Sequence, residues 1–155
     1  MNADVAQLRS LADKRPAESK QMPFPVDGKW IEATQNKLGV VFPASFVVAM
    51  ARMNGGEAET GGQTWQLFPF LDQSDRKRVR RTCNSICRET HSARAGWSGF
   101  PADAVAVGKN GCGDILCLLP DPSGCAALQH TVYWWAHETG ELHQAANDFN
   151  DLHKH

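Results

Sequence analysis

The stretch from Ala104 to Leu119, AVAVGKNGCGDILCLL, places the strongest constraint on how this chain folds. It contains two apolar segments joined by a loop whose glycines, Gly108, Gly111 and Gly113, can take positive φ without a Cβ clash, which predicts a β-hairpin. The second segment, Ile115 to Leu119, is apolar at every position, so neither of its faces carries a side chain suited to water. We therefore expect this hairpin at the centre of a sheet, with other elements covering both faces.

Capping residues and apolar periodicity predict the elements around this hairpin. In chain order they are a short helix near residues 5–12, helices between Asp27 and Gly39 and between Pro43 and Asn54, a strand over 64–70, one helix over 75–95 that Ser74 caps, a strand over 131–136 and a short closing helix over 145–152. Residues 1–27 are expected to form an N-terminal extension of helix and linker, and residues 28–155 the domain.

The overall composition is that of an ordinary globular domain, since 42% of the 155 residues are hydrophobic and 21% are charged. No run of about 18 apolar residues is present to cross a bilayer, and the N-terminus lacks the apolar core of a secretory signal. Five cysteines, an odd number, fit a reducing compartment better than a disulfide framework. We expect a cytoplasmic protein without a membrane partner.

Charge is distributed unevenly along the chain. Residues 72–94 carry seven bases against three acids, whereas residues 97–155 carry two bases against seven acids. The basic excess is concentrated on Arg76, Lys77, Arg80 and Arg81, which lie at the spacing of one helix face. Three interpretations remain open for this basic face: a solvated surface, a nucleic-acid site, or a site for an acidic protein.

Three motifs that resemble catalytic signatures are each incomplete. The run from His137 to Glu141 has glutamate where a zinc protease needs its second histidine. Gly96-Trp97-Ser98-Gly99 lacks the glycine that stands two residues before the serine of a nucleophile elbow. Gly108-Lys109 is followed by asparagine where a P-loop needs serine or threonine. The sequence predicts no catalytic residue and no cofactor.

Cys83, Cys87 and His91 follow one another at four-residue spacing, which places them along one side of a helix. The first and last are separated by roughly 12 Å along the axis, too far for joint ligation of one metal ion. The two cysteines also fall on the apolar stripe of the expected helix, and buried cysteine packs as a small hydrophobe. We predict that these residues pack in the core and bind no metal.

Several groups of residues occur together in a distinctive order. They are Trp30-Ile31-Glu32, Leu38-Gly39-Val40, Phe42-Pro43 with Phe46, Asn54-Gly55-Gly56, Val107 to Asp114, Val132-Tyr133-Trp134, and His137-Glu138-Thr139-Gly140 with Phe149. In this order they resemble the SUKH superfamily of Smi/Knr-type domains, over about residues 28–152. Gln35 departs from the pattern, because the family often has an acid there.

The resemblance implies an α+β fold, a single domain with helices packed on a central, mostly antiparallel sheet, and no common catalytic residues. In bacteria such domains look like immunity proteins, which bind and block a cognate toxin, often a nuclease or a deaminase. We therefore expect a non-enzymatic protein-binding domain whose partner is a toxin. The alternative is a regulatory or scaffold domain of the same fold with an endogenous protein partner, and a nucleic-acid-binding protein ranks below both.

A toxin that handles nucleic acid needs a basic groove, so acidic residues are the first candidates for its inhibitor's contact surface. The partner-binding residues expected on this basis, together with one strand tryptophan as an aromatic anchor, are Glu57, Glu59, Asp114, Asp121, Trp135, Glu138 and Glu141. Trp134 and Trp135 point to opposite faces of a strand, so one is expected in the core and the other exposed. For Asp114, a structural role in accepting hydrogen bonds from loop amides is the alternative.

Overall fold

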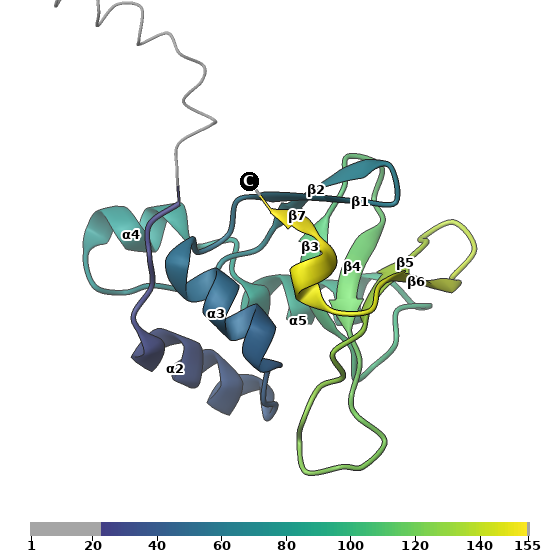
Figure 1. The fold of residues 1–155 in the computed structure, drawn as a ribbon, viewed down its shortest axis with the longest axis horizontal. Coiled ribbons are helices and arrows are strands. Elements are labelled where there is room, and N and C mark those ends of the chain that lie inside the picture. Colours follow the sequence, from purple (N-terminus) through teal and green to yellow (C-terminus); the bar gives the residue numbers. More distant parts are fainter. Residues whose placement is uncertain (1–22, 155) are drawn as a thin grey trace, which may run out of the picture.

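The expected central hairpin is formed by β3 (Val105–Lys109) and β4 (Ile115–Leu118), which pair in the middle of a seven-stranded antiparallel sheet. The computed structural model describes residues 23–154 of the chain (Figure 1). All four residues of β4 and the first four of β3 are buried. The prediction that both faces of this hairpin are covered is confirmed, and the fold is α+β.

The order of the strands in the sheet is β6-β5-β4-β3-β2-β1-β7. The flanking strands are β1 (Glu57–Thr60), β2 (Gln63–Leu67), β5 (Val132–Trp135), β6 (Leu142–Ala146) and β7 (His153–Lys154). The sheet is curled, so that β1 and β6 approach each other although four strands separate them in this order. The Thr60 hydroxyl of β1 donates a hydrogen bond to the Ala145 carbonyl of β6 at 2.9 Å. After β6 the chain runs through the 3-10 helix η2 (Phe149–Asp151) into β7, which pairs with β1.

Helices pack against the sheet (Figure 1). They are α2 (Gly28–Leu38), α3 (Ala44–Arg52), α4 (Arg76–Arg81) and α5 (Ile86–Gly96). α5 lies on β3, where the buried Thr90 hydroxyl accepts a hydrogen bond from the Ala106 amide at 2.9 Å. α3 contributes Phe46, whose ring packs edge-on against Phe149 of η2 at 4.8 Å between centroids. The core therefore lies between the helices and the sheet, with the central strands buried on both faces.

The ends of α2 follow the expected capping chemistry. The Asp27 carboxylate accepts a hydrogen bond from the Lys29 amide at 2.9 Å, which satisfies one of the free N–H groups of the first turn. Gly39 ends the helix with φ of +70°, and its amide donates to the Gln35 carbonyl. The predicted start of this helix after Asp27 and its predicted end at Gly39 are both confirmed.

Asn54, expected only to stop the second helix, is buried and bridges two segments. Its side-chain amide donates to the Phe70 carbonyl, and its side-chain oxygen accepts from the Phe70 amide, both at 2.8 Å. Asn54 also donates its own backbone N–H to the Phe24 carbonyl at 2.9 Å. One side chain thus replaces the strand partner that Phe70 lacks after β2 ends.

The prediction of one helix over 75–95 is wrong, because the chain forms α4 and α5 with a break between them. Asp75, not Ser74, caps α4 by accepting from the Arg78 amide at 2.8 Å. At the break, the Thr82 hydroxyl donates to the Arg78 carbonyl and accepts from the Asp72 amide. Ser85 then caps α5. Side chains that bond locally to the backbone compete with helix continuation, which explains the break.

Other elements differ from the expectation as well. The closing helix over 145–152 is wrong: these residues belong to the end of β6, to η2 and to the segment before β7. The strand over 64–70 ends at Leu67, and the strand over 131–136 is confirmed as β5. Of the hairpin glycines, Gly113 has φ of +100°, whereas Gly108 lies within β3. The helix expected near residues 5–12 lies outside the described residues.

Within residues 23–154, the helices are all too short or too polar to span a lipid bilayer.

Asn54→Ala is expected to lower the free energy of unfolding by about 2–4 kcal/mol, because it leaves the amide and the carbonyl of Phe70 buried without partners. Urea unfolding followed by tryptophan fluorescence measures this. Asn36→Ala, the same change at an exposed position of α2, is the control and should stay within about 0.5 kcal/mol of the unmodified protein. Equal effects of the two substitutions would contradict the bridging role of Asn54.

The cysteines are expected to differ sharply in reactivity. Cys117 is buried in β4, and burial raises the pKa of its thiol to about 12, so little thiolate is available to react. Cys83, Cys112 and Cys125 are exposed and Cys87 is half-buried. Titration of the folded protein with Ellman's reagent should modify all except Cys117, which reacts only after denaturation. Fast modification of all five thiols in the folded protein, falling to four in Cys117→Ala, would contradict the burial of Cys117 in β4.

Candidate binding surface at the hairpin end of the sheet

Three turns meet at one end of the sheet, which we call the hairpin end. They are the β1–β2 turn at Gly61-Gly62, the β3–β4 loop from Asn110 to Asp114, and the β5–β6 turn from His137 to Glu141. The antiparallel pairing of Lys109 with Ile115, and of Ile115 with Trp135, brings the last two together. A hydrogen bond from the Asn110 side chain to the Gln63 side chain at 2.5 Å ties the β3–β4 loop to the start of β2.

Asn110 organises the β3–β4 loop. Its side-chain oxygen accepts hydrogen bonds from the amides of Cys112 and Asp114, at 2.9 and 3.1 Å, and its backbone N–H donates to the Asp114 carbonyl. The amides within the β3–β4 loop are therefore bound by Asn110, whereas Asp114 accepts from the His137 amide of the β5–β6 turn. The sequence marks this position only as one residue of a glycine-rich loop.

Asp114 instead ties the β3–β4 loop to β5 and to the turn after it. One carboxylate oxygen lies 2.7 Å from His137 Nδ1 and accepts from the His137 amide at 3.1 Å. The other oxygen accepts from the Trp134 indole N–H at 2.9 Å. Burial raises the pKa of Asp114, but the hydrogen bonds from His137 and Trp134 outweigh it, and the pKa is lowered overall. The carboxylate is thus held ionised at the centre of the hairpin end.

Gly113 makes room for His137. A Cβ at this position would lie 3.2 Å from the imidazole ring, and the φ of +100° disfavours any other residue. With the Asp114 carboxylate on Nδ1, this close approach fixes the orientation of the ring. The side chains of His137 and Asp114 are 23% and 16% exposed, so the pair lies just beneath the surface.

The choice of Trp135 as the exposed anchor is wrong, because this residue is only 1% exposed. It packs against Phe100 and Trp97, with ring centroids 5.3 and 5.6 Å apart. Trp134 points to the other face and is half-buried against Trp65. Alternation along the strand predicts that Trp134 and Trp135 lie on opposite faces of the sheet. It does not predict which of the two faces other side chains cover.

Trp97 is an exposed aromatic residue of this end, and it is not among the predicted contact residues. It follows α5, is 39% exposed, and rests on Trp135 and on the His137 ring, 5.4 Å away. The loop that carries it approaches the β5–β6 turn, since a Cβ on Gly99 would lie 4.0 Å from Gly140. Its position directly after Gly96, the glycine that ends α5, is the feature of the sequence that could have indicated an exposed tryptophan.

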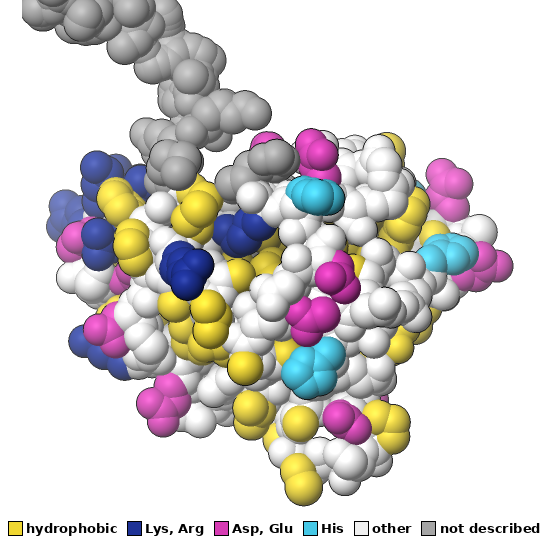
Figure 2. All heavy atoms as spheres, in the orientation of Figure 1, with side chains coloured by type: hydrophobic (Ala, Val, Ile, Leu, Met, Phe, Trp, Pro, Cys, Tyr) yellow, Lys and Arg dark blue, Asp and Glu magenta, His cyan; other side chains and the backbone are white. Residues whose placement is uncertain are grey.

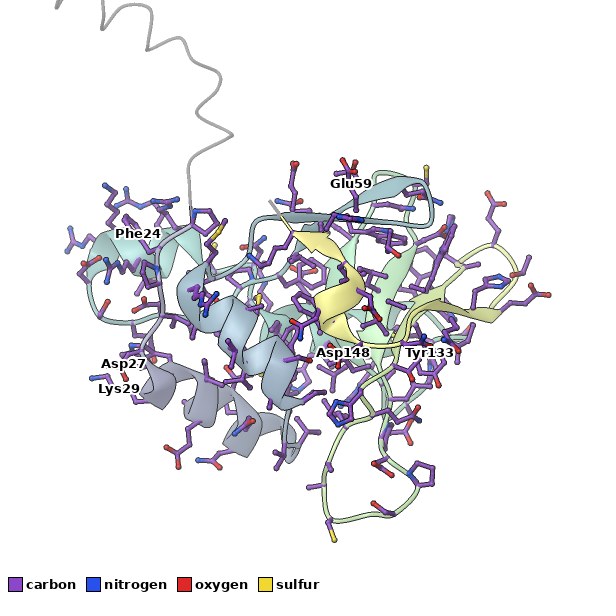
Figure 3. The ribbon with its side chains drawn as sticks, viewed as in Figure 1. Phe24, Asp27, Lys29, Glu59, Tyr133 and Asp148 are labelled. Atoms are coloured by element: carbon purple, nitrogen blue, oxygen red, sulfur yellow. The ribbon has the colours of Figure 1, made fainter. Side chains whose placement is uncertain are left out.

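The acidic residues predicted to bind a partner are brought together only in part. Glu138 and Glu141 are exposed in the β5–β6 turn, and Glu59 is exposed near the β1–β2 turn (Figure 3). Glu57 lies on the same face of β1, further from the turn. Asp121 belongs to the loop after β4, at the opposite end of the sheet, where it accepts from the Ser123 amide. The structure therefore separates Asp121 from the hairpin end.

Asp121 also borders a shallow open cavity of about 310 Å³ at the C-terminal end of α2. Arg94 lines it, but its guanidinium group is engaged by the Ala104 carbonyl through two hydrogen bonds of 3.2 and 3.0 Å. The cavity lies far from the three turns of the hairpin end, so it is not part of the candidate surface.

The cysteine–histidine series is not packed as predicted. Cys83 lies in the break between α4 and α5 and is exposed, so its expected place in the core is wrong. Cys87 is half-buried, and its sulfur lies 4.0 Å from His91 Nδ1. Among residues 23–154, no three His, Cys, Asp or Glu side chains are grouped as metal ligands would be.

Comparison with protein-family models matches residues 25–155 to the SMI1 / KNR4 family (SUKH-1). The chain belongs to this family. The match covers the segment over which the motifs resemble the SUKH superfamily, and it confirms that resemblance. Searches of curated proteins and of solved structures found no match.

In this SUKH-1 domain, Asp114→Asn is expected to lower the free energy of unfolding at neutral pH by about 1–3 kcal/mol, because His137 and Trp134 lose a charged acceptor. A carboxyl whose pKa is lowered by folding contributes stability above its ordinary pKa of 3.8 and loses that contribution as the pH falls through the lowered value. The difference between the two proteins should therefore be full above about pH 5 and shrink below about pH 4.

Thermal unfolding between pH 6 and pH 2.5 measures this difference. Asp103→Asn, at an exposed position before β3, is the control and should follow the unmodified protein throughout. If the stability difference between Asp114→Asn and the unmodified protein stays constant down to the lowest pH, the charge of the Asp114 carboxylate contributes nothing to stability.

Proposed function

We propose that this SUKH-1 protein is an immunity protein, which binds a cognate bacterial toxin of the nuclease or deaminase type and blocks it without chemistry of its own. The observation that carries the proposal is the hairpin end, where exposed carboxylates stand on turns that Asp114 and Asn110 tie to one another. Family membership supports it, because bacterial SUKH domains look like immunity proteins. The proposed contact residues are Glu59, Trp97, Glu138 and Glu141.

Charge complementarity supports a partner that handles nucleic acid. Such an enzyme must present basic side chains to phosphates, and carboxylates on an inhibitor compete for the same side chains. Glu138 and Glu141 flank the tip of one turn, and Glu59 approaches from another. Exposed carboxylates at one end of the sheet accelerate association with a basic groove and make the rate sensitive to salt.

Rigidity supports tight binding by this surface. The three turns would cost conformational entropy if they became ordered only on contact, but internal hydrogen bonds already hold them. Trp97 adds an exposed indole whose orientation is set by Trp135 and His137 beneath it. Aromatic residues with such support are frequent centres of binding energy.

The Asp114–His137 pair has the form of half a catalytic triad, so its role bears on the proposal. A triad needs a nucleophile within hydrogen-bonding reach of the second imidazole nitrogen. Within the described residues no serine, threonine or cysteine side chain bonds to His137. Its ring contacts Trp97 instead. We therefore assign the pair to support of the binding surface.

The alternative is a regulatory or scaffold role with an endogenous protein partner. Growth rescue separates the two. Expression of this chain should restore growth to cells that express a toxin encoded beside its gene, whereas a regulatory domain would give no protection.

Glu138→Lys with Glu141→Lys is expected to slow association with that toxin by about tenfold or more and to weaken protection, because two attractive charges become repulsive. Surface plasmon resonance at two salt concentrations measures the rate. Glu32→Lys with Asp103→Lys makes the same change in net charge at exposed positions on α2 and at the other end of β3, and is the control. Unchanged kinetics for the first pair would exclude the hairpin end as the contact surface.

A further inference from the structure

α4 carries a dense basic surface that the proposed function does not use. Five of its six residues are arginine or lysine, and Arg76, Lys77 and Arg80 are exposed. At about 100° per residue, these three side chains fall within one third of the helix circumference. We call Arg76, Lys77 and Arg80 the α4 surface. Lys and Arg side chains gather on the same side of the molecule in Figure 2, away from the β5–β6 turn.

The positive charges of the α4 surface are not neutralised by neighbouring acids. Among residues 23–154, Arg76, Lys77 and Arg80 have no carboxylate within ion-pair distance. The two acids nearest in sequence are engaged with backbone groups: Asp75 accepts from the Arg78 amide, and Asp72 accepts from the Ser74 amide. Like charges four residues apart on a helix destabilise it. The surface therefore maintains an unpaired charge density at a cost to the helix.

Phe24 holds the adjoining basic side chains in place. The guanidinium carbons of Arg78 and Arg81 each lie 4.4 Å from the centre of its ring, and the Lys77 ammonium lies 5.7 Å from it (Figure 3). A cation over an aromatic face remains charged while the ring sets its position. The ring thus orders part of the basic cluster in advance, which lowers the entropy cost of binding an anion.

We infer that the α4 surface binds the phosphate backbone of a nucleic acid. Consecutive phosphates of one strand present a negative charge at every 3.4 Å or so of helix axis, a density that suits three unpaired bases on less than two helical turns. An acidic protein would have to hold carboxylates equally close together against their own repulsion. Arginine, which forms most of α4, is well suited to bidentate contact with phosphate.

The inference does not depend on the immunity function, because it concerns a different surface. The full chain is titrated into a fluorescein-labelled 20-nucleotide RNA and into a 20-base-pair DNA duplex, and binding is followed by anisotropy. Three phosphate contacts predict a slope of about −2 for log affinity against log salt on the single strand. Affinity should fall about fifteenfold between 50 and 200 mM KCl.

Arg76→Glu with Arg80→Glu is expected to weaken binding by about tenfold or more, and to reduce the salt slope. Lys29→Glu with Lys37→Glu makes the same change in net charge at exposed positions of α2 and should alter affinity by no more than about twofold. Arg76→Gln with Arg80→Gln repeats the test without new acids, and circular dichroism verifies that each variant is folded.

Three results would overturn the inference. The first is no salt-dependent binding of either probe at 50 mM KCl. The second is equal loss of affinity in the α4 and α2 variants, which would show a response to net charge alone. The third is binding of a 20-residue polyglutamate peptide, lost in Arg76→Glu with Arg80→Glu, at least as tight as that of the RNA, which would assign the α4 surface to an acidic protein.

Discussion

Burial of the β3–β4 hairpin on both faces is the constraint on which the rest of this structure depends. β2 pairs with β3 so closely that a Cβ on Gly108 would lie 3.0 Å from the Gln66 carbonyl oxygen. On the helix side, Thr90 of α5 bonds to the backbone of β3 at Ala106. β2 and β5 pair with the two edges of the hairpin and α5 covers one of its faces, so all three must be in place before it is stable.

Burial on both faces also explains why the central strands can be predicted from the sequence and other elements cannot. An uninterrupted apolar run such as 115–118 has one stable environment, so the central strands are predictable. β1 is not, because only Ala58 of its four residues is buried and the other three are polar. The break after α4 is also hidden, since Thr82 is compatible with a helix until Asp72, ten residues earlier, offers its amide as a donor. Such competition is decided by tertiary structure.

The hairpin end is predictable to a smaller extent. The sequence draws attention to Asp114, Glu138 and Glu141 through the glycine-rich loop and the turn that hold them. It cannot show that Asp114 bonds Trp134 and His137, because residues 20 and 23 positions away become neighbours only through the register of β4 and β5. Trp97 is missed for a related reason. Its exposure depends on Trp135 filling the space beneath it, and alternation along a strand does not reveal which face has cover.

The bases of α4 lie on the side of this domain away from the β5–β6 turn, which carries the exposed Glu138 and Glu141 (Figures 1 and 2). A net charge of −1 gives little long-range repulsion between copies, so this separation would favour head-to-tail association if charge alone decided binding. Charge steers an encounter, whereas retention requires shape and buried aromatic contact. Trp97 lies at the hairpin end, and on α4 the ring of Phe24 is already stacked with the domain's own arginines. The contact we propose for the hairpin end therefore combines charge with an exposed aromatic residue, whereas the contact we propose for the α4 surface depends on the match between its bases and the phosphates of a nucleic acid.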